Sequence, residues 1–164
     1  MILKNVMEYN AKDKYYDIKR SYERLKKINT DNGNSISNAD PKDATEDFFN
    51  RCYHFKDWLK KDSSVALVED VENFISESKP LSLGADYCNS FKHAGLDKKS
   101  RFGQEIEKMN THVNFDLTPR GFIASARLEL TIGGKKYDTF LLATDCMKDW
   151  DNFLERNQIK FSAP

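Results

Sequence analysis

Two short segments of this chain bring together the residue types that carry acid–base and phosphate chemistry. They are residues 51–59 (RCYHFKDWL) and residues 86–93 (DYCNSFKH). Each combines a cysteine, aromatic side chains, a lysine and a histidine, and each reads as an amphipathic helix. Two of the three histidines and two of the three cysteines lie here. If the chain catalyses a reaction, these two segments are where we expect it.

The histidines suggest general acid–base catalysis. Unperturbed histidine titrates near neutral pH, so His54 and His93 could act as the acid and the base. Each helical residue advances by about 100°, which places Asp86, Asn89 and His93 within one narrow arc of the second segment. Asp86 could then orient His93, with Asn89 within hydrogen-bonding reach. The predicted catalytic residues are therefore His93, His54, Asp86 and Asn89.

Cationic side chains lie next to both histidines. Arg51, Lys56 and Lys92 could hold a phosphate group, so they are the predicted phosphate-binding residues. The alternative is that the same polar groups satisfy one another's hydrogen bonds between packed helices and do no chemistry.

A zinc site is the other chemistry that these residue types suggest. Cys52, His54, Cys88 and His93 form a set of two cysteines and two histidines. On a helix, however, the side chains of Cys52 and His54 diverge by about 200°, and those of Cys88 and His93 by about 140°. We therefore expect no metal and no cofactor.

Length and charge limit the classes of function. The chain has 164 residues, which predicts one domain spanning 1–164. Lys and Arg number 26, and so do Asp and Glu, so no overall basic field favours nucleic acid. The chain has no apolar run of about 18 residues and no signal-like N-terminus. We expect a cytoplasmic protein without disulfides and away from the membrane.

The elements that must position the candidate residues are mainly helices. Apolar residues at three- and four-residue spacing predict helices over 10–28, 41–61, 65–79 and 82–96. Asp40-Pro41 is a favourable helix start, whereas Lys79-Pro80 is expected to end the third helix. Gly84 and Gly95 would let another helix approach closely. The first helix has a basic face, but acids are interleaved there, which is usual for a solvated surface.

The period changes to two in the last third of the chain. Alternation predicts strands over 113–117 and 122–132, with turns at 118–121 and 133–134. A C-terminal helix follows over 139–157 with Asp138 as its cap, and a strand running through Leu142 is the competing prediction. We expect a mainly α, α+β fold: a four- to five-helix bundle whose helices span 10–96, a hairpin or three-stranded antiparallel sheet over 111–138, and the last helix.

Three stretches resemble a group of small uncharacterised bacterial proteins. They are the C-Y-H-x-K-D-W-L pattern at 52–59, the D-x-C-N-x-x-K-H pattern at 86–93 and the helix CMKDWDNFL at 146–154. The resemblance runs in order from about 41 to 154 and brings no established activity with it.

More loosely, a helical bundle with a polar, histidine-bearing fourth helix resembles the HEPN superfamily, whose members occur in toxins and defence systems and are often dimers. The resemblance implies RNA cleavage or nucleotide binding at a dimer interface. The ribonuclease motif of that family has an arginine four to six residues before a histidine. Here Arg51 precedes His54 by three residues, and no arginine stands at that spacing before His93. A divergent or non-catalytic member fits this departure better.

Three functions follow as expectations. The first is a HEPN-like bacterial defence or toxin-type protein that acts on or near RNA. The second is a non-catalytic interaction or regulatory subunit, with a homodimeric or heteromeric partner. The third is a sensor of a nucleotide or another small ligand.

Overall fold

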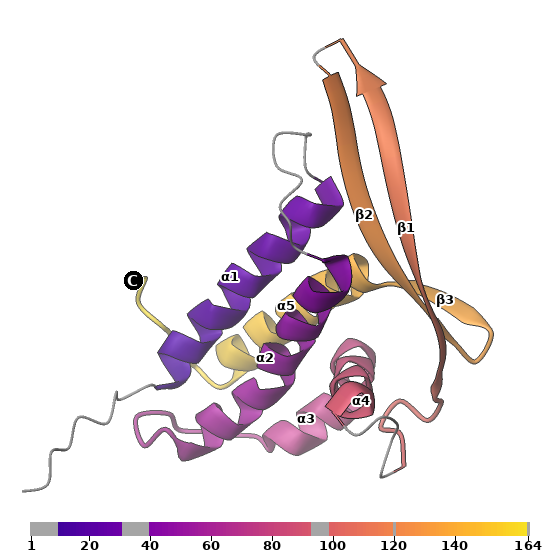
Figure 1. Cartoon of the computed structure of the whole chain (residues 1–164). Helices are drawn as coiled ribbons and strands as arrows, with labels where there is room; N and C mark the ends of the chain where they lie inside the picture. The colour runs from indigo at the N-terminus through magenta and orange to yellow at the C-terminus, as the bar shows by residue number, and fades with distance from the viewer. Residues whose placement is uncertain (1–9, 31–39, 93–98, 120, 164) are drawn as a thin grey trace, which may run out of the picture.

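The computed structural model describes residues 10–30, 40–92, 99–119 and 121–163. Within these ranges the chain forms five helices and one three-stranded antiparallel sheet that precedes the last helix (Figure 1). The elements are α1 (Ala11–Thr30), α2 (Pro41–Lys61), α3 (Val71–Glu77), α4 (Lys79–Lys92), β1 (Ile106–Thr118), β2 (Gly121–Ile132), β3 (Lys135–Asp138) and α5 (Thr139–Arg156). The predicted α+β class, mainly helical, is confirmed. No helix among the described residues is both long and apolar enough to cross a membrane.

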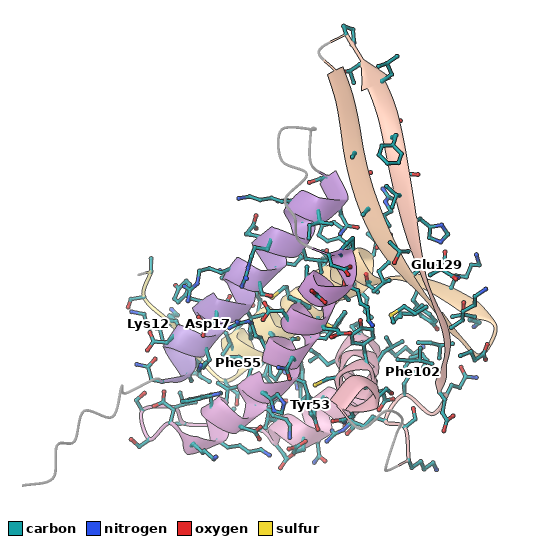
Figure 2. All side chains as sticks on the ribbon, viewed as in Figure 1. Lys12, Asp17, Tyr53, Phe55, Phe102 and Glu129 are labelled. Atoms are coloured by element: carbon teal, nitrogen blue, oxygen red, sulfur yellow. The ribbon has the colours of Figure 1, made fainter. Side chains whose placement is uncertain are left out.

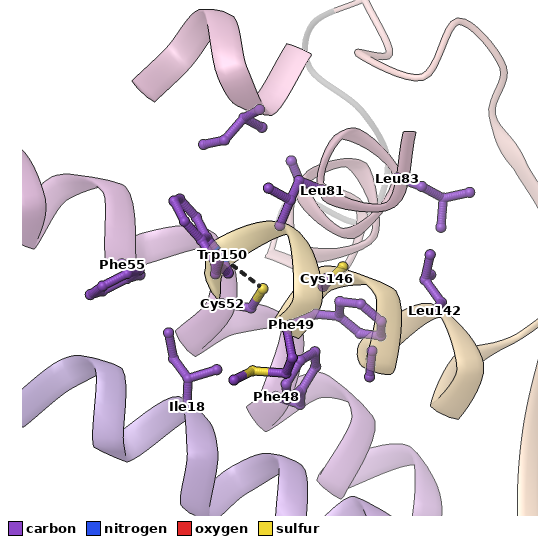
Figure 3. Close-up of a cluster of buried hydrophobic side chains, with 14 of the residues drawn as sticks. Ile18, Phe48, Phe49, Cys52, Phe55, Leu81, Leu83, Leu142, Cys146 and Trp150 are labelled. Atoms are coloured by element: carbon purple, nitrogen blue, oxygen red, sulfur yellow. Dashed lines mark hydrogen bonds between the residues drawn. The ribbon is translucent and has the colours of Figure 1, made fainter. Parts of the chain in front are cut away.

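The apolar stripe predicted on α2 forms the centre of the core. Phe48, Cys52, Phe55 and Leu59 are all buried, and they recur at the spacing of one helix face. The ring of Phe55 meets the indole of Trp150 on α5 edge to face, with ring centroids 5.0 Å apart. Figure 3 shows Phe48, Cys52, Phe55 and Trp150 within this cluster of buried side chains. Burial of aromatic surface on this scale is the main force that holds the helices together.

Gly84 lets α4 approach α2 closely, as the sequence predicted. A methyl group at Gly84 would lie 3.0 Å from Cδ1 of Phe49, which is closer than carbon atoms normally pack. Gly95, the other predicted contact glycine, lies outside the described residues.

Aspartates fix the starts of two helices. Asp40 caps α2 by accepting the backbone N–H of Lys42. Asp138 caps α5 by accepting the backbone N–H groups of Phe140 and Leu141. The helix therefore begins at Thr139, and the competing strand through Leu142 is wrong.

The junction between α3 and α4 differs from the prediction. The third helix begins at Val71 rather than Val65, because the side chain of Asp70 caps it by accepting the N–H of Asn73. The fourth helix begins at Lys79, so Pro80 lies in its first turn, where a missing N–H costs no helical hydrogen bond. Ser78 caps both helices. Its N–H donates to the carbonyl of Phe74 at the end of α3, and its hydroxyl accepts a hydrogen bond from the N–H of Leu81 in the first turn of α4.

The sheet has the order β1-β2-β3, and its first two strands form a long hairpin. Strand β1 begins at Ile106, earlier than the predicted 113, because its first half pairs with the buried end of β2. At this base Leu128, Leu130 and Ile132 are buried. The outer part, from Thr111 to Ala126, extends past the helices (Figure 1). We call this outer part of the β1–β2 hairpin the arm.

Candidate functional site

His54 lines an open groove between α2 and α4. The groove encloses about 660 Å³. Its lining residues are Asp43, Glu46, Asp47, Asn50, His54, Tyr87 and Cys88. The side chain of His54 is 41% exposed, and its Nδ1 lies 3.3 Å from Oδ2 of Asp57. The imidazole of His54 is therefore open to solvent and to a molecule in the groove.

The other residues predicted beside His93 are only partly placed. His93 itself lies outside the described residues. Lys92 is the last residue of α4, and its side chain is outside the described part as well. Asn89 is half-buried on the same helix. The pairing of His54 with His93 stays a prediction.

Asp86 is an anchor for the segment that leads into β1. Its side chain is buried, and both carboxylate oxygens accept hydrogen bonds from that segment. Oδ2 accepts from the Ser100 hydroxyl at 2.6 Å and from the Phe102 N–H at 2.9 Å. Oδ1 accepts from the Arg101 N–H at 2.9 Å. These three hydrogen bonds make Asp86 an anchor for residues 100–102, and the predicted orientation of His93 by Asp86 stays a prediction because His93 lies outside the described residues.

The predicted phosphate ligand Arg51 is paired with carboxylates. Its Nε donates to Oδ1 of Asp47 at 2.7 Å, and its Nη1 lies 3.8 Å from Oδ2 of Asp17. Asp47 also accepts from the hydroxyl of Ser21 at 2.6 Å. Arg51 thereby links α2 to α1. Its positive charge is already compensated by the carboxylates of Asp47 and Asp17.

Lys56 belongs to a cluster of charges around Glu72. Lys56 Nζ donates to Oε1 of Glu72 at 2.6 Å, Arg101 donates to Oε2 at 2.8 Å, and Lys60 also donates to Oε1. The ammonium of Lys56 and the guanidinium of Arg101 both lie over the ring of Tyr53. The cluster joins α2, α3 and the segment before β1.

This cluster changes the titration of its members. Burial alone would raise the pKa of Glu72, but the hydrogen bonds from Lys56, Lys60 and Arg101 outweigh it and lower that pKa to about 2. Burial would likewise lower the pKa of Lys56, yet the bond to Glu72 raises it. Both groups stay ionised at neutral pH. Sequence reasoning missed Glu72 and Arg101, since nothing in their spacing shows that the two segments meet.

The groove beside His54 is acidic. Asp43, Glu46 and Asp47 contribute three carboxylates to its lining. The cation predicted to serve it, Arg51, is bound to one of those carboxylates. A phosphate group entering the groove would meet carboxylates, two of which are already ion-paired: Glu46 with Lys42, and Asp47 with Arg24 and Arg51.

The cysteines are structural. Cys52 accepts a hydrogen bond from the indole N–H of Trp150 at 3.2 Å, whereas Cys88 donates to Oδ1 of Asn50 at 3.5 Å. Burial, with a further contribution from Cys52, raises the pKa of Cys146. In the part of the chain that the structure describes, no group of three or more His, Cys, Asp or Glu side chains could hold a metal ion.

The arm has an apolar face that is exposed. Val113 is 51% exposed, Phe115 70% and Leu117 77%. Phe115 pairs with Ala124, and Val113 pairs with Ala126, so the face is apolar on both strands. Alternation at 113–117 correctly predicted a strand. It did not predict this exposure, because alternation normally marks a strand with one face in the core.

Comparisons of the chain with protein-family models, with curated proteins and with solved structures gave no match in any of the three.

Proposed function

We propose that this chain is a non-catalytic protein-interaction module that binds its partner through the arm. The observation that carries the proposal is the exposed apolar face formed by Val113, Phe115 and Leu117.

The arm continues the core face of the sheet beyond the helices. Residues of alternating position share one face of a strand, so Met109, Val113 and Phe115 lie on the same side of β1. At the base, Met109 pairs with the fully buried Leu130 and packs against the core. Further out the same face carries the exposed side chains of Val113, Phe115 and Leu117, on the part of the hairpin that extends beyond the described helices (Figure 2). Contiguous exposed apolar surface of this kind marks a site of protein association.

The arm also needs support that the helices do not give it. A two-stranded hairpin on its own is marginally stable in water. Strand β3 pairs with β2 only from Glu129 to Ile132, so the arm itself has two strands. Contact with a partner would stabilise it by covering apolar surface.

A photo-crosslinking experiment tests the proposal. Benzoylphenylalanine at position 115 replaces one aromatic side chain by another, in the full chain expressed in its native host. We expect protein adducts at this position and none from the same probe at Glu23, which is exposed on α1. Failure of position 115 to give any protein adduct would overturn the proposal.

The HEPN-like ribonuclease hypothesis stays as a second candidate. The observation in its favour is that His54 lines a groove of about 660 Å³ and is open to solvent. The three carboxylates of that groove and the pairing of Arg51 with Asp47 count against RNA binding there. Activity assays of His54 and His93 variants, described in the Discussion, separate this candidate from the first.

A further inference from the structure

We infer that the partner of the arm is a second copy of this chain, and that the two copies pair β1 against β1, antiparallel, about a two-fold axis at Asn114. The inference rests on the proposed function, because it names the partner that the arm binds.

The outer edge of β1 is open for pairing. In the sheet that the described residues form, with the order β1-β2-β3, strand β1 lies at one edge. In Figure 1 it lies on the side of the arm away from α1. Proteins usually block such edges with lysine, proline or glycine bulges. From Met109 to Thr118 the strand MNTHVNFDLT contains no Lys, Arg, Pro or Gly, so its backbone groups are free of these obstacles.

Pairing about Asn114 matches the faces of the two copies. In this register, residues whose numbers add to 228 lie opposite each other, so Val113 meets Phe115 of the second copy. Both belong to the apolar face of their strand, and cross-strand neighbours of this kind stabilise a sheet by about 0.2–1 kcal/mol per pair. The apolar faces of the two arms then lie on the same side of one joined sheet of six strands, where Val113 of each copy covers part of Phe115 of the other.

The same register also matches polar groups on the opposite face. His112 meets Asp116 of the second copy, and the two-fold axis repeats this pair. An axis at Val113 would place His112 opposite Asn114, and an axis at Phe115 would place it opposite Thr118. An axis at Asp116 would place two aspartates against each other, which is unfavourable. Among axes from Val113 to Asp116, the one at Asn114 alone places the His112 imidazole opposite a carboxylate that can accept its hydrogen bond.

Disulfide trapping tests this register in the full chain. The variant Asn114→Cys places its thiol opposite the same thiol of the second copy, and we expect a covalent dimer under mild oxidation. The matched control is Ser125→Cys, since Ser125 pairs with Asn114 in the chain and shares its face. In the joined sheet the two Ser125→Cys residues would lie on the two β2 strands, three strand spacings or about 14 Å apart. That distance is too long for a disulfide, so the control should stay uncrosslinked. The native cysteines are buried, which keeps them out of the reaction.

Substitution of the His112–Asp116 pair gives a second, independent test. His112→Asp should weaken the dimer about tenfold in its dissociation constant, because two pairs become repulsive. Adding Asp116→Lys to this variant should restore the wild-type constant. Sedimentation equilibrium gives the dissociation constant of the wild type, of His112→Asp and of the double variant. A dissociation constant that neither substitution changes would overturn the inference. So would disulfide formation by Ser125→Cys as fast as by Asn114→Cys.

The outcomes also separate this inference from the proposed function. A monomeric chain whose position 115 crosslinks to a different protein would overturn the inference and support the interaction function. A monomeric chain without any protein adduct at that position would overturn both.

Discussion

The backbone N–H of Arg101 donates a 2.9 Å hydrogen bond to the buried carboxylate of Asp86, which joins the start of the sheet to the middle of α4. The same carboxylate binds the N–H of Phe102 and the hydroxyl of Ser100. One side chain on a helix therefore sets the path by which the chain enters β1. The position of the arm depends on this anchor.

Removal of that anchor should destabilise the protein. We expect Asp86→Ala to lower the free energy of unfolding by about 2–4 kcal/mol, because two partly buried backbone N–H groups lose their acceptor. Asp86→Asn keeps one acceptor oxygen and should lose less. Urea denaturation measures the loss. The matched control is Asp43→Ala, an exposed carboxylate of the groove, which should change stability by less than about 0.5 kcal/mol. Equal losses in the two alanine variants would contradict the anchoring role.

The contact of Gly84 with Phe49 should appear as a coupling energy. We expect Gly84→Ala to destabilise the protein by about 1 kcal/mol, since overpacking against the Phe49 ring exceeds the gain in helix propensity. In a Phe49→Leu background the added methyl group has room, so its cost should vanish or change sign. A double-mutant cycle by thermal or chemical denaturation gives this coupling. Additive effects of the two substitutions would contradict the close approach.

The Glu72 cluster should make stability depend on acid pH. The pKa of Glu72 is lowered to about 2 in the folded chain from an ordinary value of 4.5. The cluster therefore stabilises the fold fully above pH 4.5, and this contribution is lost as the pH falls from about 4.5 to about 2. After allowance for solvent screening we expect about 1–2 kcal/mol.

The variant Glu72→Gln isolates this contribution. Its free energy of unfolding should fall less steeply than that of the wild type between pH 4.5 and pH 2, because the titrating group is gone. Unfolding curves across this pH range give the comparison. Parallel pH profiles for the two proteins would show that Glu72 is not held ionised by Lys56, Lys60 and Arg101.

The ribonuclease hypothesis has a direct assay. We expect purified wild type, His54→Gln and His93→Ala to cleave single-stranded RNA equally, at the background of a mock preparation, because the groove is acidic. His54 is half-exposed, so its variant should keep the wild-type stability. Activity that the wild type has and either folded variant lacks would favour the HEPN-like function.

The arm should add little to the stability of one copy. We expect the double variant Phe115→Ser, Leu117→Ser to unfold within about 0.5 kcal/mol of the wild type at low protein concentration, because both side chains are exposed in the monomer. Leu130→Ala at the base should cost about 2–5 kcal/mol, since Leu130 is fully buried. Comparable losses in these two variants would show that the arm belongs to the core.

The sequence predicted elements whose signals are local. The stripe of Phe48, Cys52 and Phe55 and the caps at Asp40 and Asp138 lie within one or two turns of the helices they define. The start of α3 was missed because Val65 and Val68 continue an apolar period although Asp70 begins the helix. The apolar period shows where a helix is favourable, but it does not show which polar residue caps the helix and so fixes its first residue.

The candidate site was less predictable, because its contacts join distant segments. A helical wheel correctly places Asp86 and Asn89 on one helix face, yet it cannot show that residues 100–102 fold back onto Asp86. For the same reason Lys56 read as a phosphate ligand, whereas its ammonium is bound by Glu72 of the following helix. Which charges compensate each other is decided by tertiary packing.

Under the proposed function, recognition and folding lie in different parts of the chain. Trp150, Phe55 and Leu130 hold the framework, and Val113, Phe115 and Leu117 lie outside it. Substitutions in the arm can therefore accumulate without endangering the framework, which makes the arm the natural place for a change of binding preference to arise. The same separation makes it a convenient segment to transplant onto other antiparallel sheets, or to redesign, while the helices stay as they are.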